Sequence, residues 1–459
     1  MSKKFLTDSL LYLISDIVNK SAIFLLIPVY TSVFTVQEYG VLEVVMIIIA
    51  FSSLIVSFAS KTAYLRLGYD YDEKERKERL FDTIIFICIL AIFLFTLLFT
   101  FQDTLVDFVG EGYSAMGYYI LGYVFLLSIN ELSLVLLRFE KKVFKYLIFS
   151  FIKTTAELLA IIYFVVYLHE GVLGRVEGSL VSMIFVFLIL FKVLIWKNIT
   201  PSLNMTYLSH YVKYSLPLVL NQMVGWILIS YDKLLVGQNF SMRELGFFAL
   251  GSQILIIYKY TMESSLKAFN VELFSNPGLA SDLKNILTLI LSVSAIFALL
   301  FSFFANEFVL IMSNENYSEA SDIIKYMVIS KYISMGSAVY VMVLFAHKKT
   351  SAVSIISLKS LAVLLVVSTY LVPNYHYLGA GISAIIVNLI MFYYLTQEVK
   401  KVVKFDLGFK ILLIFILFIS GVGLSILDVG YTLSFVFLFF SSSLLYVLNK
   451  EYILKVVKG

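Results

Sequence analysis

Charged and turn residues divide this chain of 459 residues into about fourteen apolar stretches, each close to the ~20 residues that a helix needs to cross a bilayer. Hydrophobic residues make up 60% of the chain and charged residues 14%, which is more apolar surface than a single globular core buries. We therefore expect an all-α polytopic membrane protein, because helices satisfy their own backbone hydrogen bonds in lipid. The expected spans are centred near Ser21, Ala50, Ala91, Leu127, Glu157, Phe185, Val224, Leu255, Ser294, Ala338, Val363, Ile386, Ile416 and Leu438.

Lysine and arginine collect in alternate connections between these stretches, as they do on the cytoplasmic side of membrane proteins. The connection after the second stretch carries Lys74, Arg76 and Lys77, whereas the connection after the third carries only acidic charges. Only Arg175 and Arg243 break the pattern. We expect both termini to be cytoplasmic. Because the net charge of +4 follows from this asymmetry, we expect no nucleic-acid partner.

A sequence repeat relates two parts of the chain. Residues 34–40, FTVQEYG, recur as FSMRELG at residues 240–246, and both copies lie between long apolar stretches. Each copy contains a capping box, in which a hydroxyl and a glutamate satisfy backbone N–H groups at the start of a helix. We expect a helix to begin at each box. The boxes pair Thr35 with Glu38 and Ser241 with Glu244.

Further matches extend the repeat over six stretches in each half of the chain. FTLLFTF at residues 95–101 matches FALLFSF at residues 297–303, and the surroundings of Lys153 match those of Lys359. An even number of helices in each repeat makes both halves enter the membrane in the same sense. We therefore expect a six-helix lobe at residues 1–200, its repeat at residues 201–400, and two additional helices at residues 401–459.

Three segments carry a family resemblance: LLIPVYTSVFTVQEYG at residues 25–40, SLPLVLNQMVGWILISYDKLLVG at residues 215–237 and SMRELGFFAL at residues 241–250. They resemble the Wzx-type O-antigen and capsule-unit flippases, which belong to the polysaccharide transporter family of the multidrug/oligosaccharidyl-lipid/polysaccharide (MOP) exporter superfamily. The resemblance implies a MATE-like fold of two lobes, which moves undecaprenyl-pyrophosphate-linked oligosaccharide to the outer leaflet by alternating access. It also implies the bacterial cytoplasmic (inner) membrane, and a polysaccharide polymerase or assembly proteins as partners.

A pyrophosphate that bears sugars cannot cross hydrocarbon unaided, so such a substrate needs a polar, cationic path. Charged side chains within spans are unfavourable unless they face a cavity or a partner, which makes them candidates for this path. Lysine binds phosphate as a compact point charge. The lysines within the expected spans are Lys20, Lys153, Lys233, Lys259, Lys331 and Lys359.

A purely structural role is open for three of these lysines, because an acid lies four residues away on the same helix face. Lys331 and Lys359 have no acid at that spacing and are the stronger candidates. Lys61 and Lys267 occupy equivalent repeat positions near cytoplasmic ends, where they either reach lipid headgroups or form an entrance for pyrophosphate. The pairs spaced four apart are Asp16 with Lys20, Lys153 with Glu157, and Lys259 with Glu263.

The resemblance further implies a central cavity lined by the first, second, seventh and eighth helices. On the first helix, Asn19 shares a face with Asp16 and Lys20. The repeat places Gln222 and Trp226 at the matching positions of the seventh helix. Trp226 either stacks on a sugar ring or packs within the helix bundle.

Carboxylates within spans are candidates for coupling transport to an ion gradient, since they bind a proton or a sodium ion. The coupling candidates are Asp16, Asp232 and Glu263. The choice between H+ and Na+ is left open. We expect no cofactor and no metal site, because the four histidines lie apart near the ends of expected spans.

Three other functions compete with this one. A membrane glycosyltransferase or O-antigen polymerase is disfavoured because no external connection is longer than about fifteen residues, so we expect a transporter rather than an enzyme. A multidrug or cation antiporter of the same superfamily is disfavoured by the excess of intramembrane lysine, since a cavity for cationic drugs should be net negative. A lipid II flippase is left open.

Overall fold

The computed structural model describes residue 22 and residues 24–100, 116–140, 142–275, 282–403 and 408–458. Regular structure within these ranges is helical, and no strand occurs in them. Twelve helices of this described part are long and apolar enough to cross a membrane. The expected all-α membrane fold is thereby confirmed.

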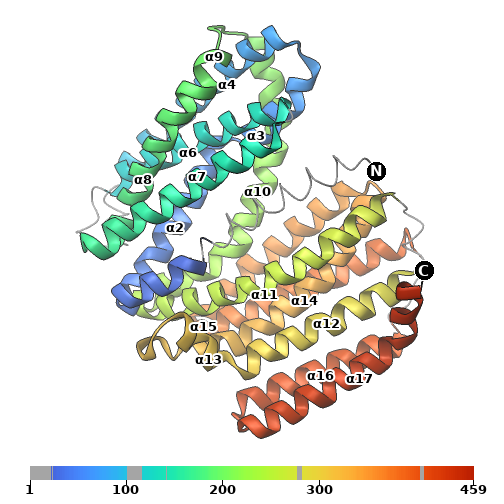
Figure 1. Cartoon of the computed structure of the whole chain (residues 1–459). Coiled ribbons are helices and arrows are strands. Elements are labelled where there is room, and N and C mark those ends of the chain that lie inside the picture. Colours follow the sequence, from blue (N-terminus) through green and yellow to red (C-terminus); the bar gives the residue numbers. More distant parts are fainter. Residues whose placement is uncertain are drawn as a thin grey trace. The chain divides into compact units, whose positions relative to one another are not determined.

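The chain forms two compact units, unit 1 at Met1–Trp226 and unit 2 at Ile227–Gly459. The helices of unit 1 are Phe24–Val33, α2 (Val36–Ser57), α3 (Ser60–Leu67), α4 (Glu73–Thr100), α6 (Met116–Phe139), α7 (Val143–Ile162), α8 (Gly171–Leu190), α9 (Trp196–Asn198) and the first part of α10 (Met205–Asn239). Unit 2 continues with the rest of α10, α11 (Met242–Ser275), α12 (Leu283–Phe303), α13 (Ala305–Met312), α14 (Ala320–Ala346), α15 (Thr350–Lys400), α16 (Gly408–Ile426) and α17 (Tyr431–Lys458) (Figure 1). The boundary between the units lies within α10, and the bounds taken from the sequence repeat stay a prediction.

The expected span centres fall on observed helices, apart from Ser21, which lies outside the described residues. α15 accounts for two expected spans, because Tyr375 and His376 have non-helical backbone angles and divide it into two parts. Each part has roughly 25 residues, which is enough to cross the hydrocarbon core.

Both capping boxes lie where a helix begins, since α2 starts at Val36 and α11 at Met242. The first box is complete: the Glu38 N–H donates to the Thr35 hydroxyl at 3.2 Å, and the Thr35 N–H donates to the Glu38 carboxylate at 2.8 Å. In the second box the Glu244 N–H donates to the Ser241 hydroxyl at 3.2 Å. The Glu244 Oε2 atom is buried and has no hydrogen-bond partner among the described residues, so this box is only half formed.

The fourth helix of each repeat forms the centre of its unit. α6 packs against α2, α3, α4, α7 and α8, and α14 packs against α11, α12, α13, α15 and α16. The two helices outside the repeat, α16 and α17, lie side by side and both contact α12 (Figure 1). The packing within each unit therefore follows the six-helix repeat that the sequence predicts.

The fifth and sixth helices of each repeat approach closely at a glycine. A Cβ on Gly174 of α8 would lie 3.0 Å from a carbonyl oxygen of the preceding helical segment. A Cβ on Gly379, at the matching position of α15, would lie 2.2 Å from a carbonyl oxygen of its own preceding segment. The two connections also each hold a histidine with positive φ, His169 at 56° and His376 at 55°. The two copies of the repeat therefore share the backbone geometry of this hairpin.

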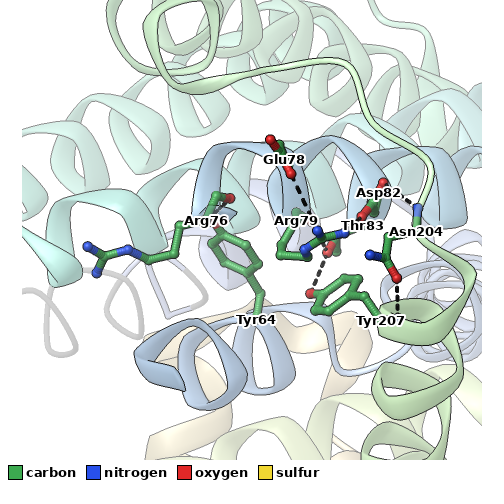
Figure 2. A network of polar contacts seen from close by, with 8 residues as sticks. All are labelled: Tyr64, Arg76, Glu78, Arg79, Asp82, Thr83, Asn204 and Tyr207. Atoms are coloured by element: carbon green, nitrogen blue, oxygen red, sulfur yellow. Dashed lines mark hydrogen bonds and ion pairs between the residues drawn. The ribbon is translucent and has the colours of Figure 1, made fainter. Parts of the chain in front are cut away.

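A polar network attaches the start of α10 to α4 within unit 1 (Figure 2). The Arg79 guanidinium lies 2.6 Å from Asp82 and 5.4 Å from the ring centre of Tyr207. The hydroxyls of Tyr207 and Thr83 share a hydrogen bond of 3.0 Å, and the Asn204 N–H donates to Asp82 at 3.4 Å. These contacts explain why the first part of α10 belongs to unit 1.

Candidate substrate-binding charges within the membrane helices

In unit 1, a carboxylate from α6 lies between two lysines from neighbouring helices. The ammonium of Lys61, in the first turn of α3, lies 2.6 Å from Oε2 of Glu131. The ammonium of Lys153, on α7, forms an ion pair with Oε1 of the same carboxylate. Two roles were expected for Lys61. Contact with lipid headgroups does not account for this ion pair, and the role as an entrance for pyrophosphate stays a prediction.

The sequence left open a pair of Lys153 with Glu157 on the same helix, and the ion pair that forms is with Glu131 of α6. Helical side chains lean toward the N-terminus of their helix, so Lys153 leans away from Glu157. Lysine before glutamate is also the weaker order for a pair spaced four residues apart. Glu131 of α6 supplies the partner that α7 does not.

Glu157 instead meets a buried arginine from α8. The Arg175 guanidinium lies 3.7 Å from Oε1 of Glu157, and the Tyr123 hydroxyl donates to the same oxygen at 3.1 Å. Arg175 also donates to the Ser179 hydroxyl one turn further along α8. The sequence pattern counted Arg175 among the charges of an external connection, but its side chain is only 7% exposed within α8. A buried guanidinium requires such a charged partner.

These groups line a cavity of about 300 Å³ inside unit 1. The lining contains Glu131 and Glu157 together with Lys153 and Arg175, and Lys61 adds a third cation beside Glu131. Sequence reasoning missed Glu131 and Arg175 as site residues. The signal that could have found Glu131 is a charge in the middle of an apolar helix. The full lining is Ala22, Leu26, Glu131, Lys153, Thr154, Glu157, Leu158 and Arg175.

Unit 2 brings a different set of charges together. The adjacent side chains of Asp232 and Lys233, on α10, are both buried. The Ser383 hydroxyl of α15 donates to the Asp232 carboxylate, at 3.1 and 3.2 Å from its two oxygens. Lys331, on α14, interacts electrostatically with Asp232 and with the ammonium groups of Lys233 and Lys259. Two other lysines predicted from the sequence therefore lie within electrostatic range of Lys331.

The lysines of unit 2 differ in their described ion pairs. Lys259 pairs with Glu263 at 3.7 Å, as its spacing predicted. Lys331 forms no ion pair of 4.0 Å or less with a carboxylate of the described residues. Asp232 is a carboxylate within electrostatic range of Lys331, and Lys259 pairs with Glu263.

Lys359 has an aromatic neighbour in place of an acid. Its ammonium lies 4.9 Å from the ring centre of Tyr394, which is also on α15. A cation over an aromatic face is stabilised by the ring quadrupole. Lys359 therefore has a partner of a different kind from that of Lys153, its counterpart in the repeat.

The remaining predicted residues are distributed as follows. Asp16, Asn19 and Lys20 lie outside the described residues, as does the side chain of Lys267. Gln222 is exposed on α10. The Trp226 indole N–H donates to the Ile47 carbonyl at 3.3 Å, and its ring packs against Phe51 with centres 4.8 Å apart. These contacts are packing of α10 on α2, and the stacking of Trp226 on a sugar stays a prediction.

Metal-ligating side chains do not gather in the part of the chain that the structure describes. No group of three or more His, Cys, Asp or Glu side chains there is arranged to hold a metal ion. The chemistry that the described site offers is electrostatic: fixed ammonium and guanidinium groups in contact with carboxylates.

The sequence matches one protein family. The pattern of the family described as polysaccharide biosynthesis protein matches residues 32–322. A comparison with curated protein sequences finds no match.

Solved structures with a similar fold are transporters. The lipid II flippase MurJ, in an inward closed conformation, is similar with a TM-score of 0.76 and 14% identity, over 99% of this chain and 100% of that one. An inward-facing multidrug resistance MATE family transporter of the MOP superfamily is similar with a TM-score of 0.64 and 13% identity, over 84% of this chain and 94% of that one. A MOP superfamily transporter from Pyrococcus furiosus, described for the reverse polarity of its binding pocket, has a TM-score of 0.52 and 15% identity, with coverage of 84% and 94%.

Proposed function

The chain belongs to the polysaccharide biosynthesis protein family, and from this membership we propose that it is a flippase for lipid-linked oligosaccharides. The proposed substrate is an undecaprenyl-pyrophosphate-linked oligosaccharide unit. It is moved from the cytoplasmic to the outer leaflet for the biosynthesis of O-antigen and lipopolysaccharide, capsule or exopolysaccharide. The fold, which is that of MOP superfamily transporters, supports a transporter rather than an enzyme.

The observation that carries the proposal is Lys331, which forms no ion pair with a carboxylate of the described residues. A positive charge inside a membrane protein is unfavourable unless an anion compensates it. The described carboxylates leave Lys331 without an ion pair. A pyrophosphate group supplies the missing negative charge, and lysine is a common ligand for it.

Alternating access is the proposed mechanism. Lysines that hold the pyrophosphate in the protein interior remove it from contact with the apolar lipid tails, so the charged head never meets hydrocarbon. The cluster is then exposed first to the inner and afterwards to the outer leaflet. Multi-pass insertion in the bacterial inner membrane, with both termini cytoplasmic and with polymerase or assembly proteins as partners, is part of the same proposal.

We propose Asp232 as the group that couples transport to H+ or Na+. It is buried and accepts from the Ser383 hydroxyl, so a proton or a cation can be exchanged without breaking an ion pair of 4.0 Å or less with a cation of the described residues. Glu263 is already engaged by Lys259. Transport by the wild-type protein should fall when both gradients are collapsed, and unchanged transport would contradict any coupling by Asp232.

The direct test uses a strain that lacks this gene and measures which leaflet holds the lipid-linked oligosaccharide. The intact gene should relieve accumulation on the inner leaflet, and the Lys331→Ala variant should relieve it at least about tenfold more slowly. Lys325→Ala is the matched control, because Lys325 lies on the same helix and pairs with Asp322 at 3.5 Å. Both variants must be present at wild-type abundance.

Two outcomes would redirect the proposal. Normal surface polysaccharide without accumulated intermediate, in a strain with no second flippase, would favour multidrug export. Rescue of a strain depleted of its lipid II flippase, without an effect on surface polysaccharide, would favour lipid II as the substrate. The second alternative is kept because the fold is similar to that of MurJ over 99% of this chain.

A further inference from the structure

The Glu131 carboxylate lies between Lys61 and Lys153, and the proposed function does not use these contacts. The two ammonium groups come from α3 and α7, and each meets a different oxygen of the same carboxylate. One negative charge therefore serves two positive charges. The arrangement keeps a residual positive charge, which a phosphate group with more than one negative charge would balance better than a carboxylate does.

The three side chains differ in their accessibility. Lys61 is 40% exposed, Glu131 is 24% exposed and Lys153 is 13% exposed. The lysine pair can thus be reached from one side, at Lys61, while Lys153 is held in the interior. The cavity of about 300 Å³ adjoins Glu131 and Lys153, and this volume lies at the lower end of the range of small-ligand pockets.

A further cation lines the cavity that adjoins Glu131. It is Arg175, whose guanidinium contacts Glu157 and Ser179 and interacts with Tyr30 and Tyr123. A carboxylate that leaves the two lysines therefore stays beside a cavity that contains a guanidinium.

The repeat shows that this arrangement is not part of the scaffold. Lys359 is the repeat counterpart of Lys153, and its ammonium lies over Tyr394. The matching region of α14 around Gly336 has no acidic residue among its nearest neighbours in sequence. A fold of this kind therefore forms without a carboxylate at the position of Glu131.

We propose that Lys61 and Lys153 form a phosphate-binding subsite of the flippase, and that Glu131 is an internal counter-anion that the phosphate of the substrate displaces. The inference rests on the proposed function and adds a residue to it. Glu131 holds the two lysines together before the substrate arrives and competes with the substrate afterwards. Phosphate enters at the exposed Lys61 and leaves when Glu131 returns.

The test measures the binding of farnesyl pyrophosphate to the full-length protein in nanodiscs of uncharged lipid. Glu131→Gln removes the competing charge and should raise the affinity about tenfold, whereas Lys153→Ala in the same background should abolish the gain. Glu140→Gln is the matched control, because it removes a carboxylate paired with Lys142 at 2.7 Å, changes the net charge equally and touches neither lysine of the subsite. Its affinity should stay at the wild-type value.

A second variant keeps the inference testable if Glu131→Gln does not fold. Lys61→Ala leaves the pair of Lys153 with Glu131 intact and should lower the affinity for farnesyl pyrophosphate about tenfold, with an unchanged unfolding temperature. Wild-type affinity in a folded Glu131→Gln or Lys61→Ala protein would overturn the inference. A gain that appears with phosphatidylglycerol nanodiscs but not with farnesyl pyrophosphate would also overturn it, since the subsite would then bind membrane phospholipid.

Failure of the inference and failure of the proposed function are distinguishable. A wild-type protein that binds the pyrophosphate and moves its lipid-linked substrate, but whose affinity ignores Glu131, contradicts the inference alone. A wild-type protein that neither binds the pyrophosphate nor relieves the accumulation contradicts the flippase as well.

Discussion

Unit 1 and unit 2 hold their intramembrane charges in different ways. In unit 1 three cations meet a carboxylate from another helix: Lys61 and Lys153 meet Glu131, and Arg175 meets Glu157. In unit 2 Lys331 has no ion pair with a described carboxylate, and it lies in range of two further lysines. The repeat therefore supplies the same backbone twice and not the same chemistry. In the proposed mechanism a phosphate has to displace the carboxylate partner of the unit 1 lysines, whereas Lys331 of unit 2 has no described ion pair to break.

The largest expected effect is the loss of a buried pair in unit 1. Arg175→Ala leaves the Glu157 carboxylate without its cation and should destabilise the protein by about 3–5 kcal/mol. Denaturant unfolding in detergent micelles measures this difference. Arg243→Ala is the matched control, since Arg243 is also an exception to the charge pattern of the connections.

Arg243 is 64% exposed and pairs with the exposed Glu319 at 3.7 Å. Its removal should change the stability by less than about 1 kcal/mol. Equal losses of stability for Arg175→Ala and Arg243→Ala would mean that the buried pair of unit 1 contributes no more to stability than the exposed pair.

The backbone of the two hairpins offers the next effect. Gly379→Ala places a Cβ at 2.2 Å from a carbonyl oxygen and should destabilise unit 2 by about 3 kcal/mol, because backbone atoms must move apart. Gly174→Ala, at 3.0 Å, should destabilise unit 1 by only about 1 kcal/mol. Thermal unfolding of the two variants compares the hairpins directly. A larger loss of stability for Gly174→Ala than for Gly379→Ala would show that the backbone of the second hairpin adjusts more easily than that of the first.

Replacing a lysine by methionine should have opposite signs in the two units. Lys153→Met removes one of the cations of Glu131 and should lower the stability by about 2 kcal/mol. Lys331→Met removes a charge without an ion pair and should leave the stability unchanged or raise it by about 1 kcal/mol, while transport is lost. The measurement is the unfolding temperature in the absence of substrate. An equal loss of stability for Lys331→Met would mean that an anion of the protein compensates Lys331. The contrast between the two units would then not hold.

The smallest expected effect concerns the capping boxes. Thr35→Ala breaks a complete box and should destabilise the start of α2 by about 1 kcal/mol. Ser241→Ala breaks a half-formed box and should have about half that effect on α11. Hydrogen exchange of the first-turn amides measures the two helix starts separately. A larger increase in exchange rate at α11 for Ser241→Ala than at α2 for Thr35→Ala would contradict this expectation.

Much of the fold could be predicted from the sequence because its signals are local. The spans follow from apolar length, the helix starts at Val36 and Met242 follow from their caps, and the pair of Lys259 with Glu263 lies on one helix face. The break in α15 at Tyr375 and His376 was also anticipated, because two spans were expected there. Each of these features depends on residues within a few positions of one another.

The site could be predicted only in part, because its contacts join different helices. Spacing gave Lys153 the partner Glu157, but the partner is Glu131, which is contributed by α6. Arg175 was counted with the charges of a connection, because the residues near it in the sequence do not indicate that it pairs with Glu157 of α7. The approach of Lys331 to Lys233 and Lys259 joins three helices and leaves no trace in the spacing of any one of them.

The sequence by itself determined that the chain is an all-α membrane protein with a duplicated set of helices and lysines inside its spans. A helix in lipid has to satisfy its own backbone and match the bilayer thickness, so composition and length decide its existence. Only the tertiary structure decided which charges are compensated. Ion pairs form over a few ångströms between side chains of separate helices. The rotation and depth of each helix, which packing sets, determine whether Lys153 meets Glu131 and whether Lys331 forms an ion pair with a described carboxylate.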